Sequence, residues 1–213
     1  MSSLRITEIF LSLQGETRTV GLPTVFVRLT GCPLRCQYCD TAYAFHGGKK
    51  IEIDDILSQV KQFQAKFVTV TGGEPLAQQA CLTLLQHLCD EGYTVSLETS
   101  GALDVSKVDH RVVKVLDIKT PGSGEVEKNN WNNLPHLSSI DQVKFVICDH
   151  ADYIWAKDVM NQHRLDDQCE ILFSPSHAQL KPGDLADWIL KDQLNVRLQI
   201  QLHKYLWGDV QGR

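Results

Sequence analysis

The hydrophobic residues of this chain form short runs that alternate with segments of helical periodicity. The runs that read as strands cover residues 4–13, 24–30, 66–70, 93–98, 112–118, 142–148, 169–174 and 196–202. The helical pattern covers residues 53–65, 76–90, 150–163 and 178–191. Strands separated by helices of this length predict βαβ units, a parallel sheet and right-handed crossovers. We therefore predict an α/β fold, a partial (β/α) barrel of about six mostly parallel strands that forms a single domain over residues 1–213.

One segment follows neither pattern. Residues 119–139 are rich in Gly, Pro, Asn and Ser. A loop of this length in a compact domain is usually functional, for example as part of a lid, or mobile. A plain surface insertion explains the same composition equally well.

Composition and charge indicate a soluble globular protein. The chain has 213 residues, of which 43% are hydrophobic and 22% are charged. Its net charge of −5 argues against a protein whose main role is to grip nucleic acid. No hydrophobic run approaches the roughly 20 residues that span a bilayer, and the first residues do not read as a signal peptide. Together with an odd count of 7 cysteines, this predicts a cytoplasmic protein with reduced thiols and no membrane partner.

The candidate chemistry lies in residues 32–40, CPLRCQYCD, where Cys32, Cys36 and Cys39 are spaced C-x3-C-x2-C. A disulfide is disfavoured in a reducing compartment. A c-type haem requires His directly after C-x-x-C, but Asp40 stands there. A thioredoxin-like dithiol leaves Cys32 without a role. Zinc is the serious alternative, with His46 as a fourth ligand, although no second C-x2-C occurs in the chain.

Three clustered thiolates also suit a cubane iron–sulfur cluster. Such clusters normally take four cysteines, so three would leave one iron with an open coordination position. We interpret the other four cysteines, Cys81, Cys89, Cys148 and Cys169, as small buried hydrophobic residues.

The cysteine spacing resembles the signature of the radical S-adenosylmethionine (SAM) superfamily. Residues 71–75, TGGEP, directly after a predicted strand, resemble the superfamily's Gly-Gly-Glu motif. This resemblance implies that the cysteines hold a 4Fe-4S cluster whose open iron binds SAM, and that one electron from the cluster cleaves SAM to a 5′-deoxyadenosyl radical. It further implies that SAM is contacted by Tyr38, Cys39, Asp40, Gly72, Gly73 and Glu74.

A closer resemblance extends over nearly the whole chain. The stretches EIFLSLQGE (8–16), TVFVRLTGC (24–32), ETSG (98–101), DIKTPGSG (117–124) and LQIQLHKYLWG (198–208) are similar to the 7-carboxy-7-deazaguanine synthases of queuosine and deazapurine biosynthesis. This family implies a radical ring contraction of 6-carboxy-5,6,7,8-tetrahydropterin to 7-carboxy-7-deazaguanine with loss of ammonia. The enzyme would be a carbon–nitrogen lyase, a homodimer that uses Mg²⁺ and an electron donor such as flavodoxin or ferredoxin, and it would not bind nucleic acid directly.

The family resemblance also implies the roles of individual residues. The substrate contacts would come from Leu13, Gln14, Gly15, Glu16, Arg28, Thr99 and His203. Further SAM contacts would come from Gly101, Gln142, Val143, Lys144, Ser174 and Pro175. Thr41 would be the protein ligand of Mg²⁺, which commonly keeps several waters and takes few protein ligands. No catalytic residue is implied beyond the cluster and the cofactor radical.

Two of these assignments have a physical rationale of their own. Arg28 alternates with hydrophobic residues on a predicted central strand, so a buried guanidinium there needs an anionic partner. The residues alone favour an Asp or Glu of the protein itself, whereas the resemblance favours a substrate carboxylate. Glu16 can accept two parallel hydrogen bonds from the guanidine-like edge of a pterin.

Two other functions compete with this prediction. A radical activase, which places a glycyl radical on a partner enzyme, uses the same cluster but does not need Arg28, Glu16 and His203 to converge on a small molecule. A non-enzymatic zinc module would explain the cysteines but not TGGEP or the C-terminal HKY.

Overall fold

The structure, a computed structural model, describes residues 2–212 and contains one nine-stranded sheet in the order β3-β1-β2-β4-β5-β6-β7-β8-β9. The strands are β1 (Ser3–Leu13), β2 (Pro23–Leu29), β3 (Lys49–Glu52), β4 (Phe67–Gly72), β5 (Thr94–Thr99), β6 (Val113–Ile118), β7 (Gln142–Ile147), β8 (Glu170–Pro175) and β9 (Arg197–Leu198). From β2 to β9 all neighbours pair in parallel, whereas β1 pairs antiparallel with both β2 and β3. The sheet is open, and its long parallel strands, β2 and β4 to β8, confirm the predicted partial barrel.

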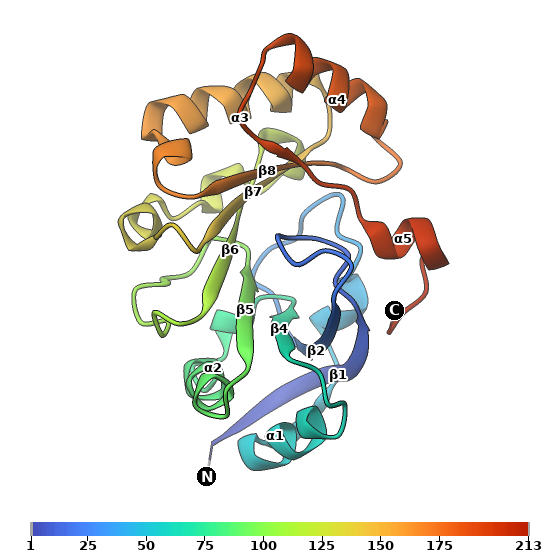
Figure 1. Ribbon diagram of the computed structural model, residues 1–213, viewed down its shortest axis with the longest axis vertical. Helices are drawn as coiled ribbons and strands as arrows, with labels where there is room; N and C mark the ends of the chain where they lie inside the picture. Colours follow the sequence, from blue (N-terminus) through green and yellow to red (C-terminus); the bar gives the residue numbers. More distant parts are fainter. Residues whose placement is uncertain (1, 213) are drawn as a thin grey trace.

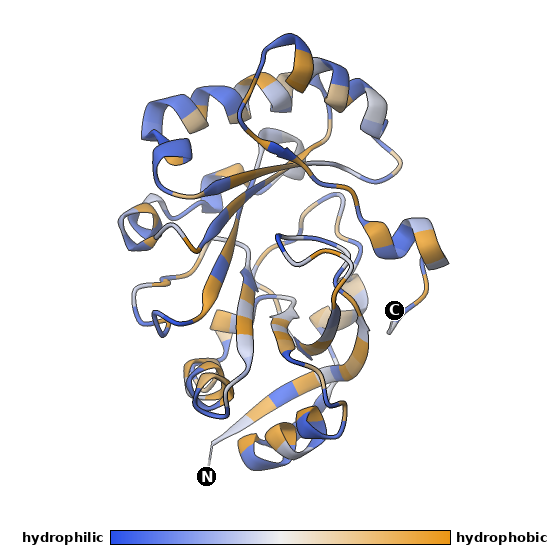
Figure 2. Cartoon of the chain, in the orientation of Figure 1, coloured by the Kyte–Doolittle hydropathy of each residue, from blue (hydrophilic) through white to orange (hydrophobic). Residues whose placement is uncertain are grey.

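The connecting helices lie around the outer side of the curved sheet (Figure 1). They are α1 (Ile53–Lys61), α2 (Cys81–Asp90), α3 (His150–His163) and α4 (Pro182–Lys191), with α5 (Leu202–Trp207) on the other side, near β1. In α1, the buried residues Ile53, Ile56 and Val60 recur at helical spacing, so this helix turns one apolar face to the sheet. Many hydrophobic residues lie along the strands, whereas α3 is largely hydrophilic (Figure 2).

Alternation along the strands separates a core face from a face that is free for chemistry. On β2, Val25, Val27 and Leu29 are fully buried in the hydrophobic core. Phe26 and Arg28 point to the opposite face, where they line a cavity. Because the strands are parallel, their carboxyl ends meet at one edge, and ligands in open α/β sheets bind at that edge.

Four predicted elements differ from the structure at one end. The helix predicted for 53–65 ends at Lys61, and the helix predicted for 178–191 begins only at Pro182. The strand predicted for 196–202 is wrong beyond Leu198, because the chain leaves the sheet and turns into α5, where the Leu202 amide donates to the Gly15 carbonyl at 3.0 Å. The helix predicted for 76–90 begins only at Cys81, because Pro75 opens a short 3-10 turn (Pro75–Ala77) that the Glu74 side chain caps. The short antiparallel strand β3 and helix α5 were not predicted.

The segment 119–139 is folded into three 3-10 turns, Pro121–Ser123, Val126–Lys128 and Trp131–His136. Asn133 is fully buried, and its amide donates to the carbonyls of Gly101 and Leu103 at 3.0 and 2.9 Å. The segment therefore packs into the protein and is not a plain surface insertion. Within residues 2–212, no helix is both long enough and apolar enough to cross a lipid bilayer.

Candidate active site

A cavity of about 230 Å³ opens at the carboxyl ends of the parallel strands. It brings together most of the residues that the sequence singled out: Leu13, Gln14, Gly15, Glu16, Arg28, Cys32, Cys36, Tyr38, Cys39, Asp40, Thr41, Gly72, Gly73, Thr99, Lys144, Ser174, Pro175 and His203. They come from eight separate segments of the chain, so only the tertiary fold places them around one cavity.

Four predicted residues do not line this cavity. Val143 is fully buried in the hydrophobic core, on the opposite face of β7 from Lys144. Gln142 lies on the same face as Lys144 but farther from the strand's end, and its side chain contacts Glu170. Gly101 is buried, and a Cβ there would lie 3.2 Å from the Asp117 carbonyl oxygen.

The fourth of these residues is Glu74, which is fully buried and organises the strand ends. Its carboxylate accepts from the Thr99 hydroxyl at 3.0 Å, from the Ser100 amide at 2.7 Å and from the Leu76 amide at 2.9 Å. Thr99 thus lines the cavity while its hydroxyl is already engaged. Glu74 joins the end of β4 to the end of β5.

The Gly-Gly pair brings the end of β4 against the start of the cysteine loop. A Cβ on Gly73 would lie 2.2 Å from the Gly31 carbonyl oxygen and 2.8 Å from the Cys32 Cβ, so no larger residue fits. This close approach allows the Glu74 amide to donate to the Gly31 carbonyl at 2.7 Å. The glycines therefore position the first cysteine, in addition to lining the cavity.

The three cysteines face the cavity from a loop without regular structure. Among the described residues, no three His, Cys, Asp or Glu side chains converge as ligands of one metal ion, and His46 is exposed and outside the cavity wall. Three thiols that line one cavity match the ligand set of a cubane cluster with one cysteine for each of three irons and one open iron. Burial raises the pKa of the Cys36 thiol to about 11, so any metal that binds this sulfur must displace its proton.

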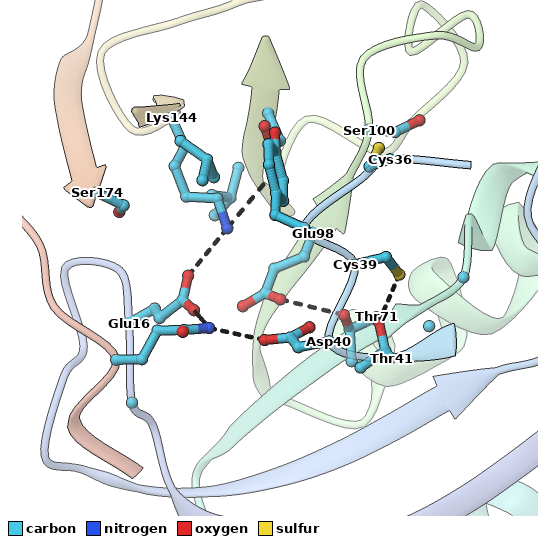
Figure 3. Close-up of a pocket in the computed structure, with 18 of the residues that line it drawn as sticks. Glu16, Cys36, Cys39, Asp40, Thr41, Thr71, Glu98, Ser100, Lys144 and Ser174 are labelled. Carbon is cyan, nitrogen blue, oxygen red and sulfur yellow. Dashed lines mark hydrogen bonds and ion pairs between the residues drawn. The ribbon is translucent and has the colours of Figure 1, made fainter. Parts of the chain in front are cut away.

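A buried charge network forms the opposite end of the cavity (Figure 3). Glu16 Oε2 accepts from Lys144 Nζ at 2.9 Å, and Glu16 Oε1 accepts from the Gln201 amide at 3.0 Å. Burial alone would raise the pKa of Glu16, but the Lys144 ammonium lowers it below its ordinary value. Glu16 is therefore an anion in the folded protein, and a ligand with a guanidine-like edge must share or exchange these two donors.

Arg28 has the internal partner that its residue pattern favoured. Its Nε donates to Glu8 Oε1 at 2.7 Å, and the Tyr43 hydroxyl donates to the same oxygen at 2.8 Å. Within residues 2–212, no protein acceptor takes the two terminal nitrogens of the guanidinium, which belongs to the cavity lining. Glu8 thus orients the guanidinium of Arg28, and its two terminal nitrogens are open to an anion in the cavity.

Sequence reasoning missed Glu98, Thr71, Asp117 and Lys119, all of which line the cavity. Glu98 faces Lys144 and Glu16, and it accepts from the Thr71 hydroxyl at 3.1 Å. Burial raises the pKa of the Glu98 carboxyl, although the Lys144 ammonium opposes the shift. The signal for these residues was their position at the ends of parallel strands, within the quoted stretches TGGEP, ETSG and DIKTPGSG.

The raised pKa of Glu98 predicts a pH-dependent stability. The folded state favours the protonated carboxyl, so this group contributes most stability at low pH and loses it as the pH rises from the ordinary carboxyl pKa of about 4.3 through the folded value. We expect Glu98→Gln, which cannot ionise, to gain free energy of unfolding relative to the wild type as the pH rises. Urea unfolding at several pH values measures this difference. A difference that stays constant with pH, as expected for Glu91→Gln at an exposed position, would contradict it.

The cavity wall also holds polar atoms that lack a partner. The Tyr38 hydroxyl, Asp117 Oδ1 and Ser174 Oγ are buried and make no hydrogen bond within residues 2–212. Lys119 Nζ pairs with the other oxygen of Asp117 at 2.9 Å. Buried polar groups are normally hydrogen-bonded, so these three atoms indicate a polar ligand at the cysteine end of the cavity. A nucleoside with ribose hydroxyls and a zwitterionic amino acid group matches this mixture of donors and acceptors.

Helix α5 closes the cavity beside the cysteine loop. Lys204 Nζ and the Gln201 amide both contact Asp40 Oδ2, at 3.0 and 2.9 Å. The His203 ring packs against Gly15, where a Cβ would lie 2.1 Å from its Nδ1. Thr41 follows Asp40, with its hydroxyl 3.8 Å from the Cys39 sulfur. The C-terminal region therefore contacts both ends of the cavity, the Glu16 end and the cysteine end.

Comparisons with known proteins find relatives that match nearly the whole chain. Residues 26–117 match the model of the Radical SAM superfamily. The chain is 46% identical to a 7-carboxy-7-deazaguanine synthase of Chlorobaculum tepidum, with 98% of this chain and 97% of the relative covered. It is 43% identical to a protein of the same name from Koribacter versatilis, with 96% and 97% covered. The crystal structure of QueE from Escherichia coli has the same fold, with a TM-score of 0.77 at 22% identity over 93% of this chain and 94% of that one.

Proposed function

The chain belongs to the 7-carboxy-7-deazaguanine synthases of the radical SAM superfamily, and on this basis we propose how its cavity makes 7-carboxy-7-deazaguanine. The substrate is 6-carboxy-5,6,7,8-tetrahydropterin, whose ring contracts with loss of ammonia in a radical reaction. We assign the reaction to the carbon–nitrogen lyases. The observation that carries the proposal is one cavity lined both by three cysteine thiols and by two groups of opposite charge, the Arg28 guanidinium and the Glu16 carboxylate.

The cysteine end fits the superfamily's cofactors. A 4Fe-4S cluster and SAM, when bound, supply the carbon radical that removes a hydrogen atom from the substrate. Cys32, Cys36 and Cys39 would hold the cluster. The unpartnered Tyr38 hydroxyl, Asp117 Oδ1 and Ser174 Oγ support SAM binding beside it. These residues orient the cofactor and exclude water, which protects a reactive intermediate from side reactions.

The other end fits the substrate. The free fork of Arg28 would bind the pterin carboxylate, and anionic Glu16 would accept from the guanidine-like edge of the ring. Glu98 lines the same cavity, and burial raises the pKa of its carboxyl, which favours the protonated form that can donate a hydrogen bond to a ring nitrogen or oxygen. Gln14, whose amide donates to Thr69 at 3.0 Å, fixes the turn that carries Glu16, since its oxygen accepts from the Glu16 amide.

Further parts of the proposal rest on the family resemblance. Thr41, on the cavity wall beside Cys39, would be the protein ligand of Mg²⁺. The protein would work in the cytoplasm as a homodimer and a single domain, with flavodoxin or ferredoxin as the electron donor. The net charge of −5 agrees with the absence of a direct nucleic acid partner.

The test is an assay of the anaerobically reconstituted protein with 6-carboxy-5,6,7,8-tetrahydropterin, SAM and a reductant. We expect 7-carboxy-7-deazaguanine and ammonia in equal amounts, with no product when SAM is left out. SAM cleavage without ring contraction, together with a glycyl radical on an added partner enzyme, would instead identify a radical activase.

A further inference from the structure

The loop that carries the three cysteines, residues 32–40, contains no helix or strand. It is held at its beginning by the hydrogen bond from the Glu74 amide to the Gly31 carbonyl. It is held at its end by the contacts of Asp40 with Lys204 and Gln201. Neither contact reaches the middle of the loop, where Cys36 lies.

The middle of the loop is held by residues 120–125, which we call the brace. The Gln37 amide donates to the Ser123 carbonyl at 3.0 Å. The Arg35 amide donates to Glu125 Oε1 at 2.5 Å. These two amides flank Cys36 directly, so the brace sets the backbone on both sides of the central cysteine. A charged acceptor makes the Arg35 contact the stronger kind of hydrogen bond.

The brace is itself anchored in the interior by Asp152, at the first turn of α3. Asp152 is 2% exposed, and its carboxylate accepts from the Thr120 hydroxyl at 2.9 Å and from the Gly122 amide at 2.8 Å. It also accepts from the Cys148 amide at 3.0 Å, which joins the brace to the end of β7. A Cβ on Gly122 would lie 2.4 Å from Asp152 Oδ2, so the close approach requires glycine.

We propose that the brace, through Glu125 and Ser123, positions Cys36 for cluster binding and slows the loss of the cluster. The proposal rests on the cluster-binding role given above to the three cysteines. Glu125 and Asp152 are then positioning residues, since neither lines the cavity. The Ser123 carbonyl and the Glu125 carboxylate hold the loop in place before iron binds. The loop therefore loses less conformational entropy when its thiolates bind iron.

The test compares Glu125→Ala with Glu127→Ala. Glu127 is an exposed glutamate two residues away that, among residues 2–212, makes no hydrogen bond or ion pair with the cysteine loop. In the cluster-free protein, hydrogen exchange at the Arg35 amide should be about tenfold faster in Glu125→Ala and unchanged in Glu127→Ala, as expected for one lost hydrogen bond to a charged acceptor. Glu125→Gln, whose amide oxygen still accepts, should restore most of the protection.

The same variants are then loaded with the cluster, and the release of iron to a ferrous chelator is followed without oxygen. We expect iron loss to be about five- to tenfold faster in Glu125→Ala than in Glu127→Ala, at equal thermal midpoints. Equal exchange or equal iron loss in the two variants would overturn the proposal. A wild-type protein that retains no iron would overturn the cluster-binding role itself, which the exchange experiment distinguishes from a failure of the brace.

Discussion

Replacement of Cys36 by alanine is expected to abolish the cluster and all product formation. The thiol is one of three that face the cavity, and a cubane bound by two cysteines would leave two irons without a protein ligand. The iron content of the anaerobic protein should fall from about four per chain to near zero, and the broad visible absorption of the cluster should disappear. Iron analysis and absorption spectra of the wild type and the variant measure this.

Cys89→Ala is the matched control for this experiment. Cys89 is a partly buried cysteine on α2 that does not line the cavity, so its loss should leave iron content and activity close to the wild type. A colourless wild-type protein with one zinc per chain would refute the enzyme and favour the zinc module. Retention of the full iron content by Cys36→Ala would show that this cysteine is not a ligand.

Replacement of Arg28 by methionine is expected to lower kcat/KM for the carboxypterin by about 10²- to 10³-fold, as when one partner of a buried hydrogen-bonded charge pair is removed. The variant keeps the length of the side chain but removes the fork that is open to the cavity. The cluster spectrum should not change, because Arg28 contacts Glu8 and not the cysteines. Steady-state kinetics with varied pterin measure the effect.

Glu8→Gln distinguishes the role of the internal partner of Arg28, Glu8, from that of the substrate carboxylate. It keeps the guanidinium and an oxygen acceptor but removes the charge of the internal ion pair, whose two atoms lie 2.7 Å apart. If Arg28 serves the substrate, Arg28→Met should be far more damaging than Glu8→Gln. Equal losses would mean that Arg28 acts only through its internal ion pair, and an intact activase reaction in Arg28→Met would favour the activase.

Much of the secondary structure could be predicted from local patterns in the sequence. The alternation of short apolar runs with helical segments predicted the parallel strands and α3 correctly, because burial patterns repeat at the period of each element. It failed at residues 199–202, where Gln199 and Ile200 continue the alternation of a strand. The sheet ends there because the Leu202 amide donates a hydrogen bond to the carbonyl of Gly15, which lies near the other end of the sequence.

The sequence by itself also narrowed the candidate chemistry of the three cysteines to an iron–sulfur cluster or a zinc site. Cys32, Cys36 and Cys39 are close in the chain, and their spacing restricts the metal they can hold before any folding is known. The TGGEP motif is also readable from the sequence. Gly73 can approach Gly31 only because it has no side chain, and a glycine is visible in the sequence before the fold is known.

Only the tertiary structure decided how the charged residues pair and which of them face the cavity. Glu16, Lys144 and Gln201 are far apart in the chain, yet Glu16 accepts from both of the others. Lys144 faces the cavity and Val143 the core because successive side chains of a strand point to opposite faces, and a shift of one residue reverses that assignment. Electrostatic interactions depend on distance and burial, which the order of residues along the chain does not contain.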